Sequence, residues 1–249
     1  MASEVEVDVW TTTLFNKFLA APANKVLDAV GVQHDSLHPW SNWITMEILV
    51  ILIMVVVFAV LKRRLSVDRP GKLQHIFEIL LSFFKDQAND NVGHAGQKYI
   101  PFFGTLFLFI LFMNLIGVIP GFESPTMSPA VPCGLAVVVF LYYNYRGARE
   151  HGVGKYLAHF AGPIPWMAPL MIPIEIISHM ARPLSLTIRL YANMYAGEQV
   201  TLAFLGLTFL VMPVAFQGLH VFVAFLQAFI FMVLAMVYVG SAVAHEDHE

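Results

Sequence analysis

The 249-residue sequence has few charged residues, since Asp, Glu, Lys and Arg make up 12% of it against about a quarter of a typical soluble domain. Its single cysteine, Cys133, excludes an internal disulfide and a cysteine-rich metal site. The net charge of −3 and the lack of a basic patch argue against nucleic-acid binding. Because 58% of the residues are hydrophobic, these absences indicate a polytopic membrane protein.

The N-terminus lacks the basic residues of a targeting peptide. Its first ten residues contain Glu4, Glu6 and Asp8 but no Lys or Arg, which is the wrong sign for a secretory or mitochondrial leader. We therefore expect no cleavable leader. A bacterial inner membrane is the favoured location, with an organelle-encoded origin as the alternative.

Motifs of enzyme chemistry are also missing. The run Gly152–Lys155 does not have the frame of a nucleotide-binding P-loop. The sequence contains neither a nucleophile elbow nor the paired histidines of a metalloprotease. We therefore predict that this chain alone catalyses no reaction, binds no nucleotide directly and needs no cofactor.

Long apolar runs predict the fold class. A membrane helix needs about 20 residues, and we expect such helices at 43–61, 102–119, 131–145, 174–211 and 214–242. The fourth would be roughly 57 Å long at about 1.5 Å per residue, nearly twice the ~30 Å hydrocarbon thickness. The prediction is an all-α membrane protein with about five membrane helices, of which the two long C-terminal ones are strongly tilted.

Charge placement predicts the orientation. Basic residues occur at 62–98 and 146–155, whereas the loop at 120–130 has none. Because basic loops stay on the cytoplasmic side, we expect the N-terminus outside and the C-terminus in the cytoplasm. Residues 1–42 then form an outer segment, and residues 43–249 form a single membrane domain.

Further helices are expected outside the spans. Residues 72–88 repeat apolar positions with the helical period, which is typical of an amphipathic helix on the cytoplasmic surface. In the outer segment we expect two short helices, at 11–20 and 24–30, separated at Pro22 because proline interrupts helices.

The predicted helix at 174–211 carries one ionisable stripe. Glu175, Arg182 and Arg189 are seven residues apart and drift by only about 20° per step. Two more polar residues join the stripe at four-residue spacing, His179 and Asn193. An arginine in lipid costs about 2.5–3.5 kcal/mol on insertion scales, so it normally faces protein or water and marks an ion path.

The stripe suits proton transfer to a carboxylate on a partner. A fixed arginine stabilises a nearby ionised carboxylate, and this chain has few acids of its own near Arg189. A partner carboxylate that moves past the arginine would release its proton there and take up another before it enters lipid. Moving one charge down a membrane potential is worth about 2.3 kcal/mol per 100 mV.

Two segments closely resemble the signature of subunit a of F-type ATP synthases. They are Arg182–Glu198, with the sequence RPLSLTIRLYANMYAGE, and Leu226–Leu234, with the sequence LQAFIFMVL. The segment Phe112–Gly121 resembles an earlier span of that family. The resemblance covers about residues 45–243 and implies a membrane bundle whose two long tilted helices curve along a rotating ring of c subunits.

The resemblance implies roles for six residues. Arg189 matches the arginine that faces the carboxylates of the ring, and Gln227 matches a glutamine beside it. The positions that match polar residues of the half-channels are Glu198, His220, Asn193 and Glu175. Glu198 follows Arg189 by nine residues, about half a turn of rotation, so we expect it to face the last helix.

Other polar residues are candidates for the channel lining, namely Asn114, His179, Arg182 and Ser185. Structural roles stay open for all of them, and Ser185 could bond to a backbone carbonyl instead of lining water. Asn114 could bond between helices, and His179 could be a satisfied helix-face histidine. Arg182 could pair with Glu175 or reach the cytoplasmic interface.

The uptake half-channel departs from the family pattern. Gly117 stands where some relatives have an acid. Glu123, Glu47 or water could serve there instead.

The predicted function is that of the proton-translocating stator subunit of an F-type ATP synthase, with two half-channels separated by Arg189. Expected partners are the c-subunit ring, the b subunits of the peripheral stalk, the rest of the synthase and the lipid bilayer. The alternative is a secondary transporter or ion channel with an intramembrane arginine site, although the chain lacks the repeated halves typical of transporters. A scaffold without transport would leave the arginine stripe unexplained.

Overall fold

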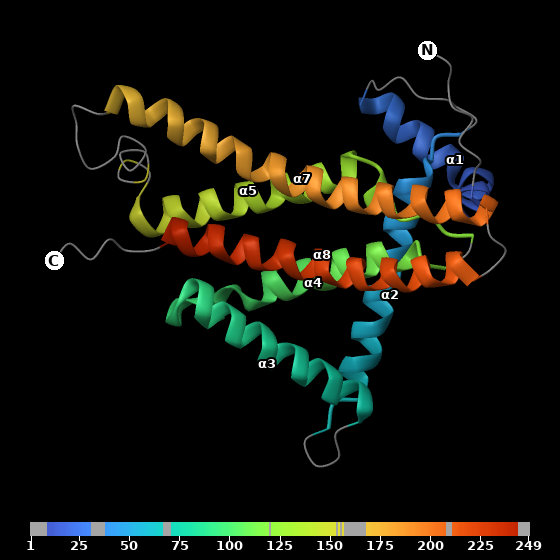
Figure 1. Cartoon of the computed structure of the whole chain (residues 1–249), viewed down its shortest axis with the longest axis horizontal. Helices are drawn as coiled ribbons and strands as arrows, with labels where there is room; N and C mark the ends of the chain where they lie inside the picture. The colour runs from blue at the N-terminus through green and yellow to red at the C-terminus, as the bar shows by residue number, and fades with distance from the viewer. Residues whose placement is uncertain are drawn as a thin grey trace.

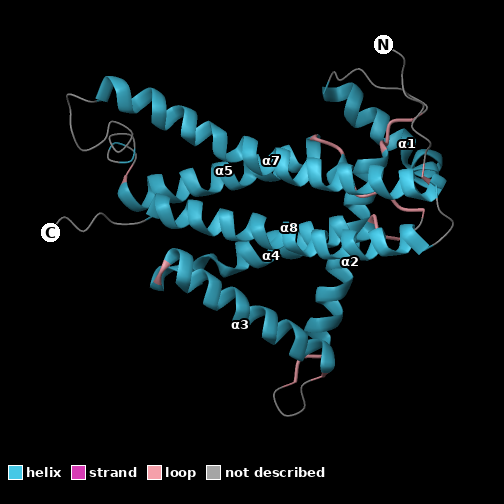
Figure 2. Cartoon of the chain, in the orientation of Figure 1, coloured by secondary structure: helices cyan, strands magenta, loops and turns pink. Residues whose placement is uncertain are grey.

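The computed structural model describes residues 9–30, 38–66, 71–119, 121–152, 154, 156, 168–207 and 211–243. Every regular element in these ranges is helical, as Figure 2 shows, and this confirms the predicted all-α class. The helices are α1 (Trp10–Val30), α2 (Asn42–Arg63), α3 (Lys72–Val92), α4 (Ile100–Ile116), α5 (Ala130–His151), α7 (Ala168–Leu207) and α8 (Val211–Val243). Two 3₁₀ turns, η1 (His94–Tyr99) and η2 (Pro125–Met127), precede α4 and α5.

Three helical segments of the described chain are long and apolar enough to cross a membrane. They are α2, the segment Gly96–Ile116 that contains α4, and the part of α8 from Val214 to Val243. The other two expected spans also form helices, α5 and α7, which pack along α8. Both carry several charged residues, which lower their hydropathy. The chain is therefore an all-α membrane protein.

The long helices form one bundle. In Figure 1, α4, α5, α7 and α8 run along the long axis of the view, while α2 crosses their direction. Helix α8 is the centre, because it contacts α3, α4, α5 and α7. Relative to α2, whose length and composition suit an upright span, the two long C-terminal helices are steeply inclined.

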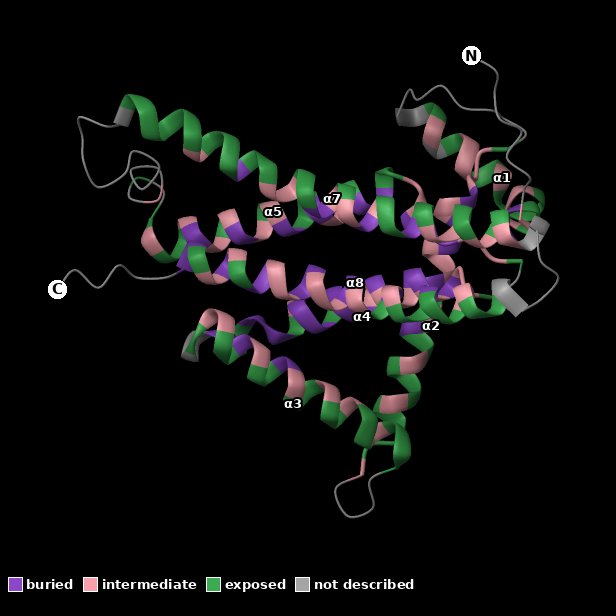
Figure 3. Cartoon of the chain, in the orientation of Figure 1, coloured by how far each residue is buried: buried purple, intermediate pink, exposed green. Residues whose placement is uncertain are grey.

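The core lies mainly between α4 and α8. Large side chains of α4, such as Phe103, Phe107 and Ile110, are fully buried. Helix α8 meets them with small residues, Ala224, Ala228 and Ala235, which let neighbouring helices approach closely. In contrast, α2 exposes many apolar side chains along its length (Figure 3), as expected for a helix surrounded by lipid.

The N-terminal segment differs from the prediction. It forms the single helix α1, with Pro22 inside it, instead of two helices broken at that proline. Contacts with the start of α2 explain why the helix continues. The indole of Trp40 donates to the Leu19 carbonyl at 3.0 Å, and the hydroxyls of Thr12 and Thr45 lie 2.7 Å apart. These bonds offset the cost of an internal proline.

The amphipathic helix α3 extends one turn past the predicted 72–88. It forms the third side of a triangle with α2 and α8 in Figure 1. Phe84 and Ala88 are buried against the bundle. Gly104 of α4 makes room for Phe84, because a Cβ there would lie 3.2 Å from the Phe84 ring. The apolar face of α3 is thus partly used for packing.

Candidate functional site

The paired helices α7 and α8 carry most of the predicted site. Leu186, Leu190 and Met194, four residues apart, are almost fully buried and form the packing face of α7. Arg189 is half-buried at the edge of this face, next to Ile188, whose side chain is 54% exposed. The arginine thus lies at the border between the protein interior and an uncovered face of α7.

One turn beyond Arg189, a hydrogen bond joins the two long helices. The Asn193 side-chain amide donates to Gln227 Oε1 at 2.8 Å. Gln227 is buried, and its Nε2 group has no hydrogen-bond acceptor among the described residues. Two of the predicted residues are therefore in contact at the level of the arginine.

A second group of predicted residues lies toward the C-terminal end of α7. A Cβ on Gly197 would lie 3.2 Å from His220 Nδ1, so the imidazole ring of α8 packs directly on the α7 backbone beside Glu198. His220 is buried, and its Nε2 atom lacks a hydrogen-bond partner within the described part of the chain.

The loop after α4 closes this end of the site. Glu198 is half-buried, and Glu123 of that loop is near enough for the two charges to interact. Gln217 of α8 donates from Nε2 to the Val118 carbonyl at 2.6 Å, which ties the start of α8 to the end of α4. Residues from three elements thus form one polar region, here called the Glu198 cluster, which consists of Glu123, Glu198 and His220.

The opposite half of α7 makes polar contacts with α5. His179 is buried, and its Nε2 atom lies 2.9 Å from Asn144 Oδ1 and 3.3 Å from the Tyr143 hydroxyl. Tyr156 also donates to Asn144 Oδ1, at 3.0 Å. Burial raises the pKa of the Tyr156 phenol above its ordinary value, so this group stays protonated and remains a donor.

Arg182 lies next to this network. Its guanidinium is 5.3 Å from the centre of the Tyr238 ring on α8 and 6.0 Å from that of Tyr143 on α5, which are cation–π distances. No ion pair within 4 Å joins Arg182 to Glu175 in the described residues. The geometry favours aromatic contacts over the ion pair that the sequence left open. We call this region the Arg182 cluster, which consists of Tyr143, Asn144, Tyr156, Glu175, His179, Arg182 and Tyr238.

The two remaining candidates lie in different surroundings. Asn114 is fully buried, accepts from Thr126 at 2.8 Å and donates to the Ala224 carbonyl at 3.4 Å. Its amide therefore links α4, η2 and α8, which favours the interhelical role. Ser185 is exposed on the open face of α7, four residues before Arg189.

Sequence reasoning missed several neighbours of the site. Tyr143, Asn144, Tyr156 and Tyr238 were not candidates, and Gly197 was noted only as part of a motif. The sequence does carry a signal, since tyrosines and an asparagine gather at the basic end of α5.

The site as a whole has two polar clusters on either side of Arg189. Along α7, Glu198 is nine residues from Arg189 and Glu175 is fourteen, or about 13 Å and 21 Å at 1.5 Å per residue. The described residues contain no group of three His, Cys, Asp or Glu side chains that could hold a metal ion. The arrangement thus places titratable side chains on both sides of a central fixed charge.

Comparison with known proteins finds one family to which the chain is similar. The family model described as ATP synthase A chain matches residues 43–240. The chain is 61% identical over 233 residues to ATP synthase subunit a of Solibacter usitatus, covering 94% of this chain and 100% of the relative. It is 48% identical over 238 residues to the subunit a of Koribacter versatilis, covering 95% and 97% of the two chains. Identity to the subunit a of Nitratidesulfovibrio vulgaris Hildenborough is 43% over 215 residues, with 86% and 89% covered.

Proposed function

The chain belongs to the ATP synthase A chain family, and we propose that it is the proton-translocating stator subunit of an F-type ATP synthase. In this proposal it provides two half-channels that lead to the carboxylates of a c-subunit ring. Arg189 separates the half-channels, so that protons cross the membrane only when the ring turns. The chain itself is not catalytic.

The observation that carries the proposal is the position of Arg189 between two polar clusters. The Glu198 cluster and the Arg182 cluster lie on opposite sides of the arginine along α7. Glu175 and Glu198 are 23 residues apart, or roughly 35 Å along the inclined helix, so the two clusters are well separated from each other. Each cluster can therefore serve one side of the membrane.

Two buried polar atoms support a hydrated path. His220 Nε2 and Gln227 Nε2 have no protein partner in the described part of the chain. Buried polar groups without a protein partner are normally satisfied by water. Water bound at His220 Nε2 would extend a hydrogen-bonded path from the Glu198 cluster toward Gln227 and Arg189.

The chemistry then follows from the fixed charge of the arginine. A c-subunit carboxylate beside Arg189 is stabilised in its ionised form, and so releases its proton there. Away from the arginine, the carboxylate must be protonated, because a charge in lipid is costly. The membrane potential supplies about 2.3 kcal/mol per charge and 100 mV, which biases the direction of rotation.

An uncovered face of α7 suits the ring. Small residues follow one another along this face at helical spacing, and all are exposed: Ala181, Ser185, Ala192 and Ala196. Small side chains let another helix approach closely in a membrane. Arg189 lies at the edge of the same face, within reach of a carboxylate on a neighbouring helix.

The remaining partners and the orientation belong to the same proposal. The b subunits of the peripheral stalk would hold the chain against the ring. The N-terminus would lie outside and the C-terminus in the cytoplasm, because basic residues concentrate on one side of the spans.

The decisive experiment replaces Arg189 with Ala in the assembled complex. We expect Arg189→Ala to abolish proton-driven ATP synthesis and ATP-driven proton pumping in membrane vesicles, while the complex still assembles. The matched control is Arg63→Ala, which removes an exposed arginine at the end of α2 and should leave both activities intact. Normal ATP-driven pumping by Arg189→Ala vesicles would reject the proposal.

A further inference from the structure

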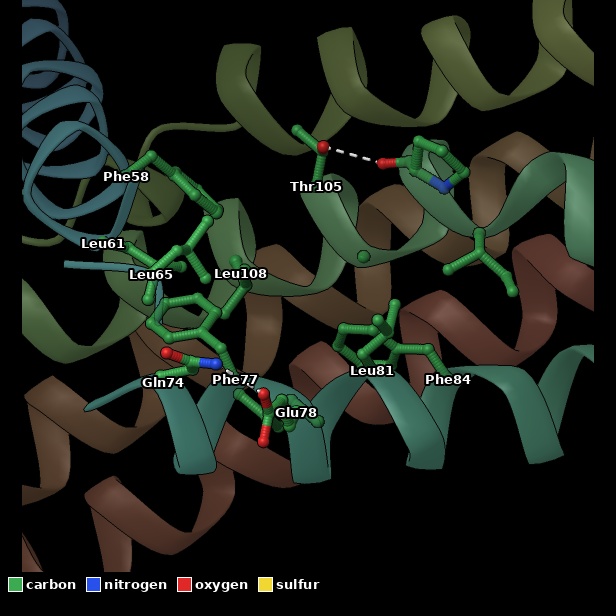
Figure 4. Close-up of a pocket in the computed structure, with 14 residues that line it drawn as sticks. Phe58, Leu61, Leu65, Gln74, Phe77, Glu78, Leu81, Phe84, Thr105 and Leu108 are labelled. Atoms are coloured by element: carbon green, nitrogen blue, oxygen red, sulfur yellow. Dashed lines mark hydrogen bonds between the residues drawn. The ribbon is translucent and has the colours of Figure 1, made fainter. Parts of the chain in front are cut away.

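A cavity of about 380 Å³ lies between α2, α3 and α4, away from the proton path (Figure 4). Its walls are mostly apolar and include Phe58, Leu61, Phe77, Leu81, Thr105 and Leu108. This volume is within the range of small-molecule sites in proteins. The cavity therefore has room for a ligand with an apolar part.

A second hollow of about 230 Å³ adjoins the first. The two share Leu61 and Gln74 in their walls, so they meet along one edge. Among the described residues, the lining of the second hollow is basic, because it includes Arg64 and Lys72 and no acidic side chain. Within the described residues, no carboxylate lies within 4 Å of either cation. An apolar space thus leads into a positively charged one.

Hydrogen bonds hold the corner between these helices in shape. Gln74 accepts from the Ser66 backbone N–H and donates to the Ser66 carbonyl, both at 3.0 Å. Its amide also donates to Glu78 Oε1 at 2.8 Å, which engages the one acid of the apolar cavity. The rings of Phe58 and Phe77 are in contact at 5.6 Å. The site is therefore formed before any ligand arrives.

The position of the two hollows matches the profile of a bilayer. Helix α2 is the most apolar of the candidate spans, and its basic end at Lys62, Arg63 and Arg64 lies at the level of the lipid headgroups. Both hollows lie at this end of α2, since Leu61 and Leu65 line the apolar cavity and Leu61 and Arg64 line the basic hollow. Basic pockets between helices at this level are typical sites for anionic headgroups.

From this complementarity we infer that the corner of α2, α3 and α4 binds one anionic phospholipid. An acyl chain fills the cavity around Phe58 and Leu108, and the phosphate contacts Arg64 and Lys72. The inference concerns a structural lipid and does not depend on the proposed proton path.

Native mass spectrometry of the full chain, released from micelles after titration with one lipid, tests the inference. We expect one phosphatidylglycerol to be retained roughly 10- to 30-fold more tightly than phosphatidylcholine, as two basic contacts would give. The variant Arg64→Ala/Lys72→Ala should lose this preference. Equal retention of the two lipids by the unmodified chain would overturn the inference.

A matched control distinguishes lipid binding at this site from nonspecific attraction to surface charge. Arg63→Ala/Lys85→Ala removes two exposed cations from the same helices, but neither residue lines the hollows. The control should keep the preference for phosphatidylglycerol. A loss as large as that of Arg64→Ala/Lys72→Ala would reject a defined site. Inorganic phosphate in excess should not displace the lipid, and displacement would reject a lipid in favour of a free anion.

A second variant tests the apolar part. Thr105→Trp places a large ring in the cavity and should prevent retention of any phospholipid. The control Val56→Trp adds the same ring on an exposed part of α2 outside the cavity and should retain lipid normally. Circular dichroism should show that both variants keep their helical content. Undiminished phosphatidylglycerol binding by folded Thr105→Trp would contradict the assignment of the cavity to an acyl chain.

Discussion

Gly197 lies where a side chain of its own would press on His220. The ideal Cβ is 3.2 Å from Nδ1 and 3.3 Å from Cε1 of the imidazole, which is closer than most real Cβ contacts. The absence of a side chain therefore lets a titratable ring of α8 lie against the backbone of α7. Polar residues of α7 and α8 also differ in burial, since Arg189 is half-buried while His179 and Gln227 are buried.

At this scale we predict that Gly197→Val destabilises the protein by about 1–3 kcal/mol, because overpacking forces side chains out of position. Thermal unfolding of the purified chain in detergent measures the effect. Combining it with His220→Ala should cost less than the sum of the two single changes, because the clash is then removed.

The control for this prediction is Gly134→Val in α5, where a Cβ would meet no atom within 4 Å. It should cost less than Gly197→Val. Strict additivity of Gly197→Val and His220→Ala would contradict the contact.

At the scale of elements, two helices continue through prolines that would be expected to end them. Helix α7 runs for 40 residues with Pro173 and Pro183 inside it, and α1 contains Pro22. Each proline costs helix stability, and in α1 hydrogen bonds to residues at the start of α2 offset part of the cost. At the α2–α3 corner, by contrast, one side chain has the main effect. Gln74 of α3 forms two hydrogen bonds with the Ser66 backbone and so holds the segment after α2 against the start of α3.

For this corner we predict that Gln74→Leu loosens the start of α3. The change removes two bonds to the Ser66 backbone, each worth about 0.5–1.5 kcal/mol. Amide hydrogen exchange in peptides from this corner should therefore become roughly tenfold faster, as mass spectrometry can measure. Gln97→Leu, at an exposed position of η1, should leave exchange there unchanged. Equal exchange in Gln74→Leu and the unmodified chain would show that Gln74 does not hold the corner.

At the scale of the whole molecule, the inclination of α7 and α8 relative to α2 turns one face of α7 outward (Figure 1). The bundle covers the opposite face through α5 and α8. In the proposed assembly, the outward face meets the ring while α2 meets lipid or other subunits. This division follows from the packing of all the helices together.

We predict that a photoreactive benzophenone at residue 188 cross-links to the c subunit in the assembled complex. The label is attached to Ile188→Cys in a Cys133→Ser background, which removes the only native cysteine. Immunoblotting against the c subunit detects the product. The control Val56→Cys has nearly the same exposure, 53% against 54% for Ile188, but lies on α2. Failure at residue 188, or equal yields at both positions, would argue against the ring-facing role of this face.

The class of the protein, its apolar helices and the arginine stripe follow from the amino-acid sequence alone. These features depend on hydropathy and helical period, which are local properties of the chain. The family signature around Arg189 is also contiguous in sequence. For that reason the match to the ATP synthase A chain family could be anticipated before any helix was packed.

Which polar side chains meet depends on how the helices pack in three dimensions. Asn193 bonds Gln227 from 34 positions away, and His179 bonds Asn144 from 35. Such pairs depend on where two helices cross, and no local pattern specifies that. The continuous α1 and the apolar cavity beside Gln74 have the same origin, because both are made by contacts between elements distant in sequence.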